Sequence, residues 1–466
     1  MSSSLTTLVG GFLDLLNSQI HRRCISVYCN LNNHVYGIIQ YGKYIYKFNP
    51  VDKSCTTIDI PPLKRNIHVF GGTYDEKGGI YCKAHWKDGV VTKCGIVKID
   101  TTRGDAVTLL LGVLQPHQHF TYILGTTRGV LGLDGHIYYM PKNLPGKMIK
   151  LDTDRNTFEC VGGCLEYGEY YWWAVRGADG CIYGIPRQTR KIMKYNPVTK
   201  VTSLVGEEYN SYSYFYCGGN GALAKNGCIY AFSNSHSWIL KINTNQHDEN
   251  DTFVAWEWIT NFTIPKLLQP YGDAILGLDG CIYWPPNDAN YTLYHNPLNG
   301  HTSIVGHDLG TLQNKYYGGA LAPDGAIYCM PWHAAKVLAI DPFRLFQETL
   351  PSYMIRNPRE KFGSLFDHDG EGITYFDSAI IKYGRRGFEA VIKHLPVPNN
   401  CQFSNSNLYP FVAAALCPNC ALSVVYYLLR QAPALIQTTT IPCNIVGSHS
   451  DDDTPLNKKQ RIHGEV

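Results

Sequence analysis

The five residues Asp179-Gly180-Cys181-Ile182-Tyr183 decide the fold, because close variants of this stretch recur along most of the chain. Four copies keep the order Asp-Gly-x-Ile-Tyr, and the others place Asn, Lys or Gly at its first positions. The copies end on tyrosines that are 45, 57, 45, 47, 53 and 45 residues apart: Tyr36, Tyr81, Tyr138, Tyr183, Tyr230, Tyr283 and Tyr328. This spacing predicts seven copies of one structural unit.

A second landmark keeps the same register. In each unit an Asn or Asp precedes a Pro or Thr, as at Asn196-Pro197, and it lies 13 residues after the tyrosine in five units. The offset is 14 in the third unit and 19 in the second, where residues 87–94 are expected to form an inserted loop. Two independent landmarks at one offset indicate a true structural repeat.

The physical chemistry of each landmark fits a blade of four strands. An Asp-Gly or Asn-Gly pair between apolar runs makes a tight hairpin, because such turns need positive φ angles. In the fourth unit the third and fourth strands are expected at residues 191–195 and 201–205. A lone unit cannot bury both of its faces, whereas a closed ring of units can. The sequence therefore predicts a mainly β chain, a seven-bladed β-propeller of four-stranded blades over residues 24–352.

The Asp-Gly-x-Ile-Tyr hairpin and the Asp341-Pro342 turn resemble those of kelch-like and lactonase-like propellers. The resemblance implies a propeller architecture rather than a particular protein. The lactonase-like resemblance implies carboxylate and amide ligands that converge on a metal ion in the central channel.

The composition narrows the class of partner. Charged residues make up 17% of the chain and the net charge is +3, which does not favour nucleic acid or an acidic membrane as a partner. No apolar run is long enough to cross a bilayer. Cys181, Cys228 and Cys281 occupy one repeat position before an Ile-Tyr pair, so we expect reduced thiols that act as small core residues. The expected location is cytoplasmic, with a nuclear location as the alternative.

Three segments flank the predicted ring. Leu and Phe residues in 1–23 are spaced as in an amphipathic helix that packs on the body. Residues 353–447 are expected to be helical and are similar to a single degenerate ankyrin unit. Residues 448–466 are polar and predict a disordered tail. Its basic run Lys458-Lys459-Gln460-Arg461 is either solvated or an import signal.

The candidate site lies where propeller loops gather. The segments that enter the inner strands and those that join the second and third strands share one face of a propeller. Aromatic and polar residues in these segments form the predicted binding face: Trp86, Tyr171, Trp172, Arg187, Tyr216, Tyr271, Tyr317, Trp332 and His333. The alternative is that these rings pack between blades and make no contact with a partner.

Two functions follow from these patterns. The sequence favours a non-catalytic binding or scaffold protein without a cofactor, whose aromatic face binds a protein, peptide or glycan. The alternative is a lactonase- or lyase-like enzyme with a metal ion, calcium, in the channel. Asp273 and Asn220 are its candidate ligands, although calcium prefers six or more oxygen ligands. No short catalytic motif is present.

Overall fold

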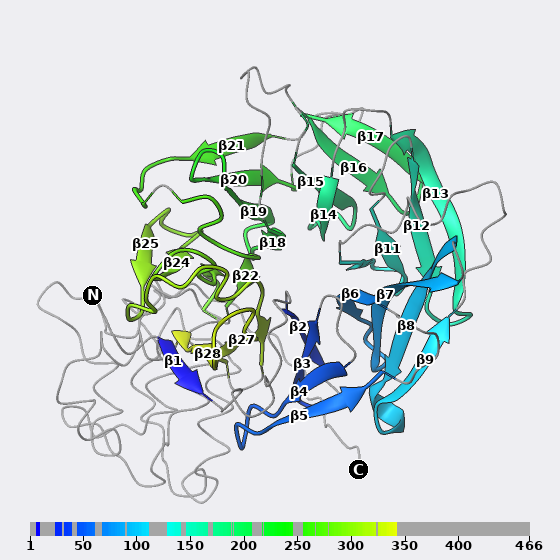
Figure 1. The fold of residues 1–466 in the computed structure, drawn as a ribbon. Helices are drawn as coiled ribbons and strands as arrows, with labels where there is room; N and C mark the ends of the chain where they lie inside the picture. Colours follow the sequence, from blue (N-terminus) through cyan, green and yellow to red (C-terminus); the bar gives the residue numbers. More distant parts are fainter. Residues whose placement is uncertain are drawn as a thin grey trace, which may run out of the picture.

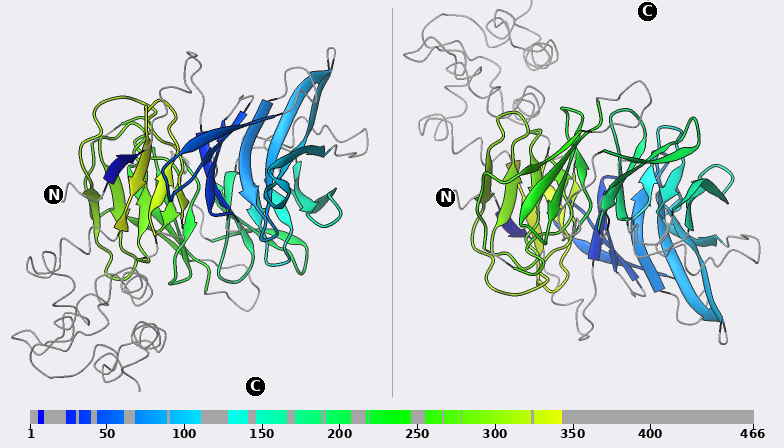
Figure 2. Two further views of the ribbon diagram at one scale, coloured as in Figure 1. Left: turned by 90° about the horizontal axis from the view of Figure 1, so that it is seen from below. Right: turned by 90° about the horizontal axis from the view of Figure 1, so that it is seen from above.

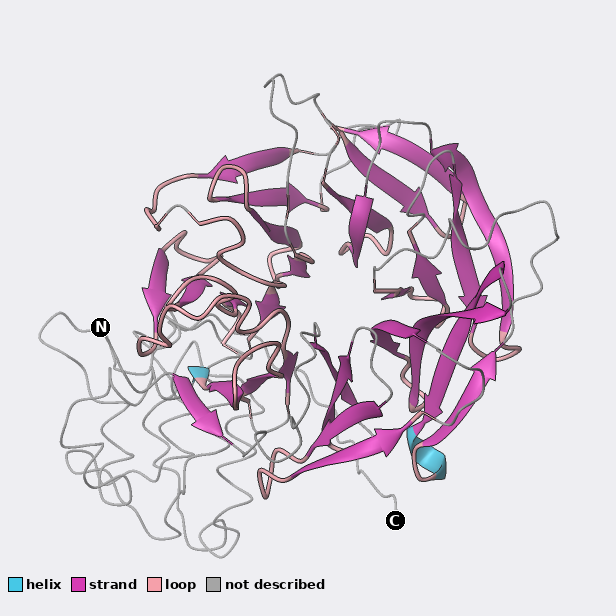
Figure 3. Ribbon diagram, in the orientation of Figure 1, coloured by secondary structure: helices cyan, strands magenta, loops and turns pink. Residues whose placement is uncertain are grey.

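A computed structural model describes residues 6–9, 24–29, 32–39, 44–60, 68–88, 91–110, 128–140, 146–165, 171–187, 189, 191–206, 217, 219–245, 255–265, 267–277, 279–322 and 325–342. These residues form seven antiparallel sheets of four strands each, arranged as a ring (Figures 1 and 3). The predicted seven-bladed propeller is thereby confirmed.

The blades follow one another along the chain. Blade 1 comprises β2 (Cys24–Cys29), β3 (His34–Ile39), β4 (Tyr44–Phe48) and β5 (Cys55–Asp59). Blade 2 comprises β6 (His68–Tyr74), β7 (Gly79–Asp88), β8 (Val91–Asp100) and β9 (Ala106–Leu110), with the short 3-10 helix η2 (Thr101–Arg103) after β8. Blade 3 comprises β10 (Val130–Leu131), β11 (Ile137–Tyr139), β12 (Gly146–Asp152) and β13 (Thr157–Leu165). Blade 4 comprises β14 (Tyr171–Arg176), β15 (Ile182–Pro186), β16 (Ile192–Asn196) and β17 (Val201–Val205). Blade 5 comprises β18 (Ala222–Leu223), β19 (Cys228–Ser233), β20 (Trp238–Asn243) and β21 (Trp256–Ile259). Blade 6 comprises β22 (Ile275–Leu276), β23 (Ile282–Trp284), β24 (Thr292–His295) and β25 (Thr302–Val305).

The seventh blade is assembled from both ends of the ring. It comprises β26 (Ala320–Leu321), β27 (Ile327–Cys329), β28 (Val337–Ile340) and, as its outer strand, β1 (Thr6–Val9). β1 pairs antiparallel with β28, from Thr6 opposite Ile340 to Val9 opposite Val337. The predicted helix over 1–23 is wrong at these four residues, because the open edge of β28 offers backbone partners that complete the sheet. The rest of 1–23 lies outside the described residues.

Contacts between inner strands close the ring. Each inner strand contacts the inner strand of the next blade, and β26 contacts β2 to complete the circle. The side views in Figure 2 show the strands running between the two faces of the ring. The face that carries the segments entering the inner strands is called the loop face below, and the opposite face, with the hairpins, is called the turn face.

The recurrent motif builds the hairpin between the first two strands. In blade 6, Asp279 Oδ1 accepts a hydrogen bond of 3.1 Å from the Cys281 amide, and its Oδ2 accepts one of 2.7 Å from the Tyr283 hydroxyl. Gly280 takes a φ of +83°, which explains the glycine at this position. The same tyrosine-to-aspartate bond joins Tyr138 to Asp134 and Tyr183 to Asp179. The first and fifth residues of the motif are therefore joined by a hydrogen bond.

The second blade departs from the prediction for 87–94. β7 and β8 extend to a tip, with Asp88 paired to Val91, so the extra residues lengthen the strands of a hairpin. The pairing continues because every additional residue adds a ladder hydrogen bond and a cross-strand contact.

The core lies between adjacent blades. One cluster combines Tyr36 and Ile45 of blade 1 with Ile80 and Val97 of blade 2, and equivalent clusters occur around the ring. The three motif cysteines are buried and carry reduced thiols, as expected. The predicted helical segment 353–447 and tail 448–466 lie outside the described residues. Within the described part of the chain, no helix has the length and apolar character needed to cross a membrane.

Candidate functional site

Each blade has one equivalent position in its inner strand or directly before it. In every blade one inner-strand residue pairs with the motif tyrosine. The residue two places before it is called the inner position, and it is occupied in blade order by Ile25, Gly71, Arg128, Trp173, Asn220, Asp273 and Gly318. Unlike the hairpin motif, this position holds a different kind of side chain in almost every blade.

A charged contact spans the ring at this level. Arg128 in blade 3 places Nη2 3.4 Å from Oδ2 of Asp273 in blade 6, three blades away. Asp273 is 1% exposed, and its Oδ1 accepts a 2.8 Å hydrogen bond from the Asn220 amide. Burial raises the pKa of the Asp273 carboxyl, while the Arg128 guanidinium and the hydrogen bond from Asn220 act in the opposite direction. The centre of the ring is thus bridged by a desolvated ion pair.

Backbone contacts fix the carboxylate of Asp273 in place. Its amide donates a 2.6 Å hydrogen bond to the Tyr317 carbonyl, and the Ala274 amide donates one of 2.9 Å to the Asn220 carbonyl. The preceding residue, Gly272, lies so close to blade 7 that a Cβ atom there would be 1.8 Å from the Tyr317 carbonyl oxygen. Three neighbouring inner strands are therefore held together at the site of the ion pair.

Aromatic rings make a second contact across the ring. Trp173 of blade 4 and Tyr317 of blade 7 have ring centroids 6.0 Å apart, and Ile25 of blade 1 belongs to the same buried cluster. Trp332 lies against Tyr317 at 6.0 Å, and His333 lies 5.4 Å from Trp332. Trp332 and His333 are partly exposed on the loop face. These ring contacts form a continuous series from the buried centre of the propeller to the loop face.

The other predicted face residues have separate environments. Trp86, Tyr171 and Tyr271 are buried at 2% exposure in three different inter-blade clusters. The Tyr171 hydroxyl donates to the Lys191 carbonyl, and Tyr271 packs edge-on against Phe232. These three rings have the packing role that was the alternative to partner contact. Arg187 is partly exposed, whereas the side chain of Trp172 and all of Tyr216 lie outside the described residues.

The two candidate metal ligands do lie side by side. However, the cation next to the Asp273 carboxylate is the Arg128 guanidinium, and Asn220 contacts that carboxylate through its backbone amide. In the described part of the chain, no three His, Cys, Asp or Glu residues are grouped as metal ligands would be. The donor set that the structure describes therefore fits an ion pair better than a calcium site.

The loop face of blades 6 and 7 is organised by one carboxylate. Asp288 Oδ2 accepts a hydrogen bond from the Gln269 amide and its Oδ1 accepts one from the Asn314 amide. The neighbouring residues Leu268 and Leu312 are 85% and 50% exposed. The Trp332 amide donates to the Lys315 carbonyl, which joins the same loops to the partly exposed rings. Sequence analysis missed these two leucines because they belong to no repeated motif.

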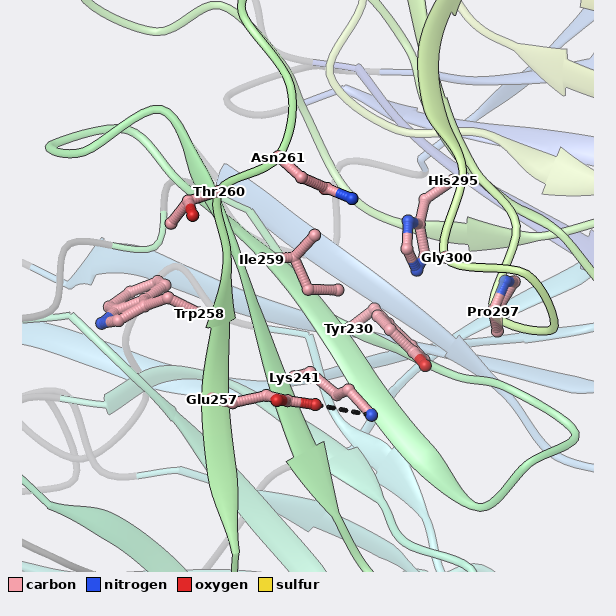
Figure 4. A pocket seen from close by; sticks show the side chains of 10 residues that line it. All are labelled: Tyr230, Lys241, Glu257, Trp258, Ile259, Thr260, Asn261, His295, Pro297 and Gly300. Carbon is pink, nitrogen blue, oxygen red and sulfur yellow. Dashed lines mark hydrogen bonds and ion pairs between the residues drawn. The ribbon is translucent and has the colours of Figure 1, made fainter.

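A pocket of about 320 Å3 lies elsewhere, between blades 5 and 6 (Figure 4). Strands β19, β20 and β21 form one wall, and the turn that follows β24 forms the other. Its polar lining includes Tyr230, Lys241, Glu257, Asn261 and His295. These residues are scattered over 66 positions of sequence in two blades, so no local pattern indicated the pocket.

Comparison with known proteins gives fold relatives only. No model of a known protein family matches the sequence, and no curated protein matches it. A streptogramin B lyase structure superposes with a TM-score of 0.53 and 15% identity, over 72% of this chain and 99% of the lyase. Virginiamycin B lyase from Staphylococcus aureus, a catalytically inactive variant solved with quinupristin, superposes with a TM-score of 0.53 and 12% identity, over 72% and 98%. At these identities the chain shares with the lyases its β-propeller fold.

Proposed function

We propose that this chain is a non-catalytic binding protein that holds a segment of a partner protein on the loop face of blades 6 and 7. The observation that carries the proposal is the supported surface formed by Trp332 and His333. Trp332 packs against Tyr317, which packs against Trp173 across the ring, so the partly exposed rings have a rigid base. Rigid aromatic anchors contribute much of the free energy of protein association, because little conformational entropy is lost when they bind.

Exposed apolar side chains extend the same surface. Leu268 and Leu312 lie on either side of Asp288 on the loops beside Trp332. Leu268 is mostly exposed, and Leu312 is half exposed. Large apolar side chains that project next to an aromatic pair are typical of sites that bury against another protein.

The enzyme alternative has less support at the centre of the ring. A general acid or base must reach the substrate, but Asp273 is 1% exposed and is engaged by Arg128 and Asn220. The likeness to lyases rests on the fold, and one fold carries many functions. The described channel residues thus favour a role in holding the ring together.

The test compares partner capture by three forms of the immobilised protein. Proteins captured from source-cell extract by the wild type are identified, purified and titrated against the wild type, Trp332→Ala/His333→Ala, and Leu133→Ala. Leu133 is 72% exposed on the turn face and serves as the matched control. We expect the double variant to bind at least about tenfold more weakly and the control to bind normally.

Two results would overturn the proposal. One is equal binding by all three forms. The other is loss of binding together with a large fall in melting temperature of the double variant, which would mean that the rings only pack. An Asp273→Asn variant that abolishes turnover of a small substrate while keeping partner capture would support the enzyme alternative.

A further inference from the structure

The pocket between blades 5 and 6 is lined from several separate strands. Tyr230 comes from β19, Lys241 from β20, and Glu257 and Ile259 from β21, while Asn261 follows β21 and His295 ends β24 of the next blade. In Figure 4 the side chains of Asn261 and His295 converge from opposite walls, and the ring of His295 lies next to that of Tyr230. The pocket shares none of its lining residues with the Trp332 surface.

The charged groups of the pocket neutralise each other. Lys241 Nζ donates a 2.6 Å hydrogen bond to Glu257 Oε1, and this bond raises the pKa of Lys241. The two side chains form an ion pair, and the pair has no net charge. A ligand with a single charge would compete with one member of the pair and leave the other without its partner.

The imidazole of His295 is also uncharged. Its Nδ1 lies 2.8 Å from Thr302 Oγ1, and its ring lies 5.0 Å from the ring of Tyr230. Burial, together with the nearby Lys241 and His301, lowers the pKa of His295 to about 4. The side chain is 1% exposed, so it forms part of the buried wall of the pocket.

The remaining lining combines hydrogen-bonding groups with small apolar surfaces. The Tyr230 hydroxyl accepts a 2.9 Å hydrogen bond from Asn226. Asn261 presents an amide that both donates and accepts, while Ile259 and Pro297 present aliphatic surface. Such a lining matches a ligand that carries several hydroxyl groups on an aliphatic ring.

We infer that this pocket is a binding site for a neutral saccharide residue, held by hydroxyl contacts to Asn261 and to the Lys241–Glu257 pair. A sugar hydroxyl donates and accepts at once, so it can bind beside the ion pair without separating it. The C–H surface of the sugar ring would lie on Ile259. A volume of about 320 Å3 suits one sugar ring, which leaves the rest of a glycan in solvent.

The experiment is a saturation-transfer NMR screen of the full chain with glucose, galactose, mannose and N-acetylglucosamine, followed by titration of each sugar that binds. Leucine and glucose 6-phosphate are the zwitterionic and anionic comparison probes. The variants are Asn261→Ala, which removes the amide, and Asn261→Trp, which fills the pocket from an exposed position. Gln313→Ala, at an exposed amide on blade 7, is the matched control.

We expect at least one neutral sugar to bind the wild type and the Gln313→Ala variant equally. Asn261→Ala should weaken it about fivefold, the effect of one lost hydrogen bond, and Asn261→Trp should abolish it. The inference is overturned if none of the four sugars binds, if Asn261→Trp binds as well as the wild type, or if leucine or glucose 6-phosphate binds in preference. Melting curves of the variants check that the fold is retained.

Discussion

The guanidinium of Arg128 and the carboxylate of Asp273 meet across the centre of the ring, with Nη2 3.4 Å from Oδ2. Both residues occupy the same repeat position, in blades 3 and 6. A ring of blades is held mainly by contacts between neighbours, whereas this pair ties together two blades that are not neighbours. Its side chains are 17% and 1% exposed, so the interaction is little screened by water.

Replacing Asp273 with alanine should lower the free energy of unfolding by about 3–5 kcal/mol, because it leaves the Arg128 guanidinium desolvated and without this partner. Urea unfolding followed by tryptophan fluorescence measures the change. The control is Arg128→Met/Asp273→Leu, which replaces the pair with apolar side chains and should recover most of the loss. A single variant as stable as the wild type would show that the pair does not contribute to stability.

The contrast between the hairpin motif and the inner position explains what the sequence could predict. The motif is visible because Asp279 and Tyr283, or their equivalents, must bond to each other in nearly every blade. The inner position changes from blade to blade, since contacts such as Arg128 with Asp273 require different residues on opposite sides. The fold can be predicted because the repeated units carry the same motif, whereas the contacts at the centre of the ring depend on residues that differ between the units.

The direction of individual side chains was the other feature that the sequence could not predict. Trp332 and His333 are partly exposed, but their place in a loop gave no sign that Trp86 and Tyr271, predicted on the same grounds, turn into the inter-blade core. The direction of a side chain depends on the strand twist and on the neighbouring blade. Whether the surface around Trp332 binds a partner stays a prediction.

Acidification should destabilise the protein through His295. Its folded-state pKa is lowered to about 4 from an ordinary value of 6.5, so the folded state binds a proton less readily than the unfolded chain does. The resulting stabilisation is fully present above pH 6.5 and is lost as the pH falls to about 4. By linkage it amounts to about 3 kcal/mol.

The measurement is urea unfolding at several values of pH for the wild type and for His295→Gln, which cannot take up a proton. The difference in free energy between the two proteins should change by about 3 kcal/mol between pH 7 and pH 4. Parallel curves over this range would contradict the prediction, since the other titrating groups are common to both.

The motif tyrosines should differ in their contribution to stability. Tyr283→Phe removes a donor from Asp279, which is 2% exposed, and should cost about 1.5–3 kcal/mol. Tyr138→Phe removes the same bond from Asp134, whose side chain is 33% exposed and lies 3.2 Å from Lys150. Water can replace that bond, so the cost should stay below about 1 kcal/mol. Chemical denaturation compares the two variants, and an equal cost would refute the role of burial.

Two glycines test the close approach of the inner strands. An alanine at position 272 would place its Cβ 1.8 Å from the Tyr317 carbonyl oxygen, so Gly272→Ala should cost about 3 kcal/mol or more. At the exposed Gly163 the nearest atom to a new Cβ is 3.7 Å away, at Thr202. Gly163→Ala should therefore change the stability by less than about 1 kcal/mol. Similar melting temperatures for the two variants would show that the inner strands can move apart.

The pairing of β1 with β28 should control the closure of the ring. Thr6 is 3% exposed, and its hydroxyl oxygen lies 2.8 Å from His307 Nδ1 and accepts a hydrogen bond from the His307 amide. Deletion of residues 1–9 removes these contacts and every ladder bond to β28, and it leaves that strand as an exposed edge. We expect the melting temperature to fall by about 5 °C or more, with self-association visible by size-exclusion chromatography. Thr6→Val keeps the strand and loses only the hydroxyl, so it should cost about 1 kcal/mol and stay monodisperse relative to the wild type. If the protein that lacks residues 1–9 has the same melting temperature as the wild type, the seventh blade does not need its fourth strand. Closure must then depend on contacts between inner strands, such as that of β26 with β2.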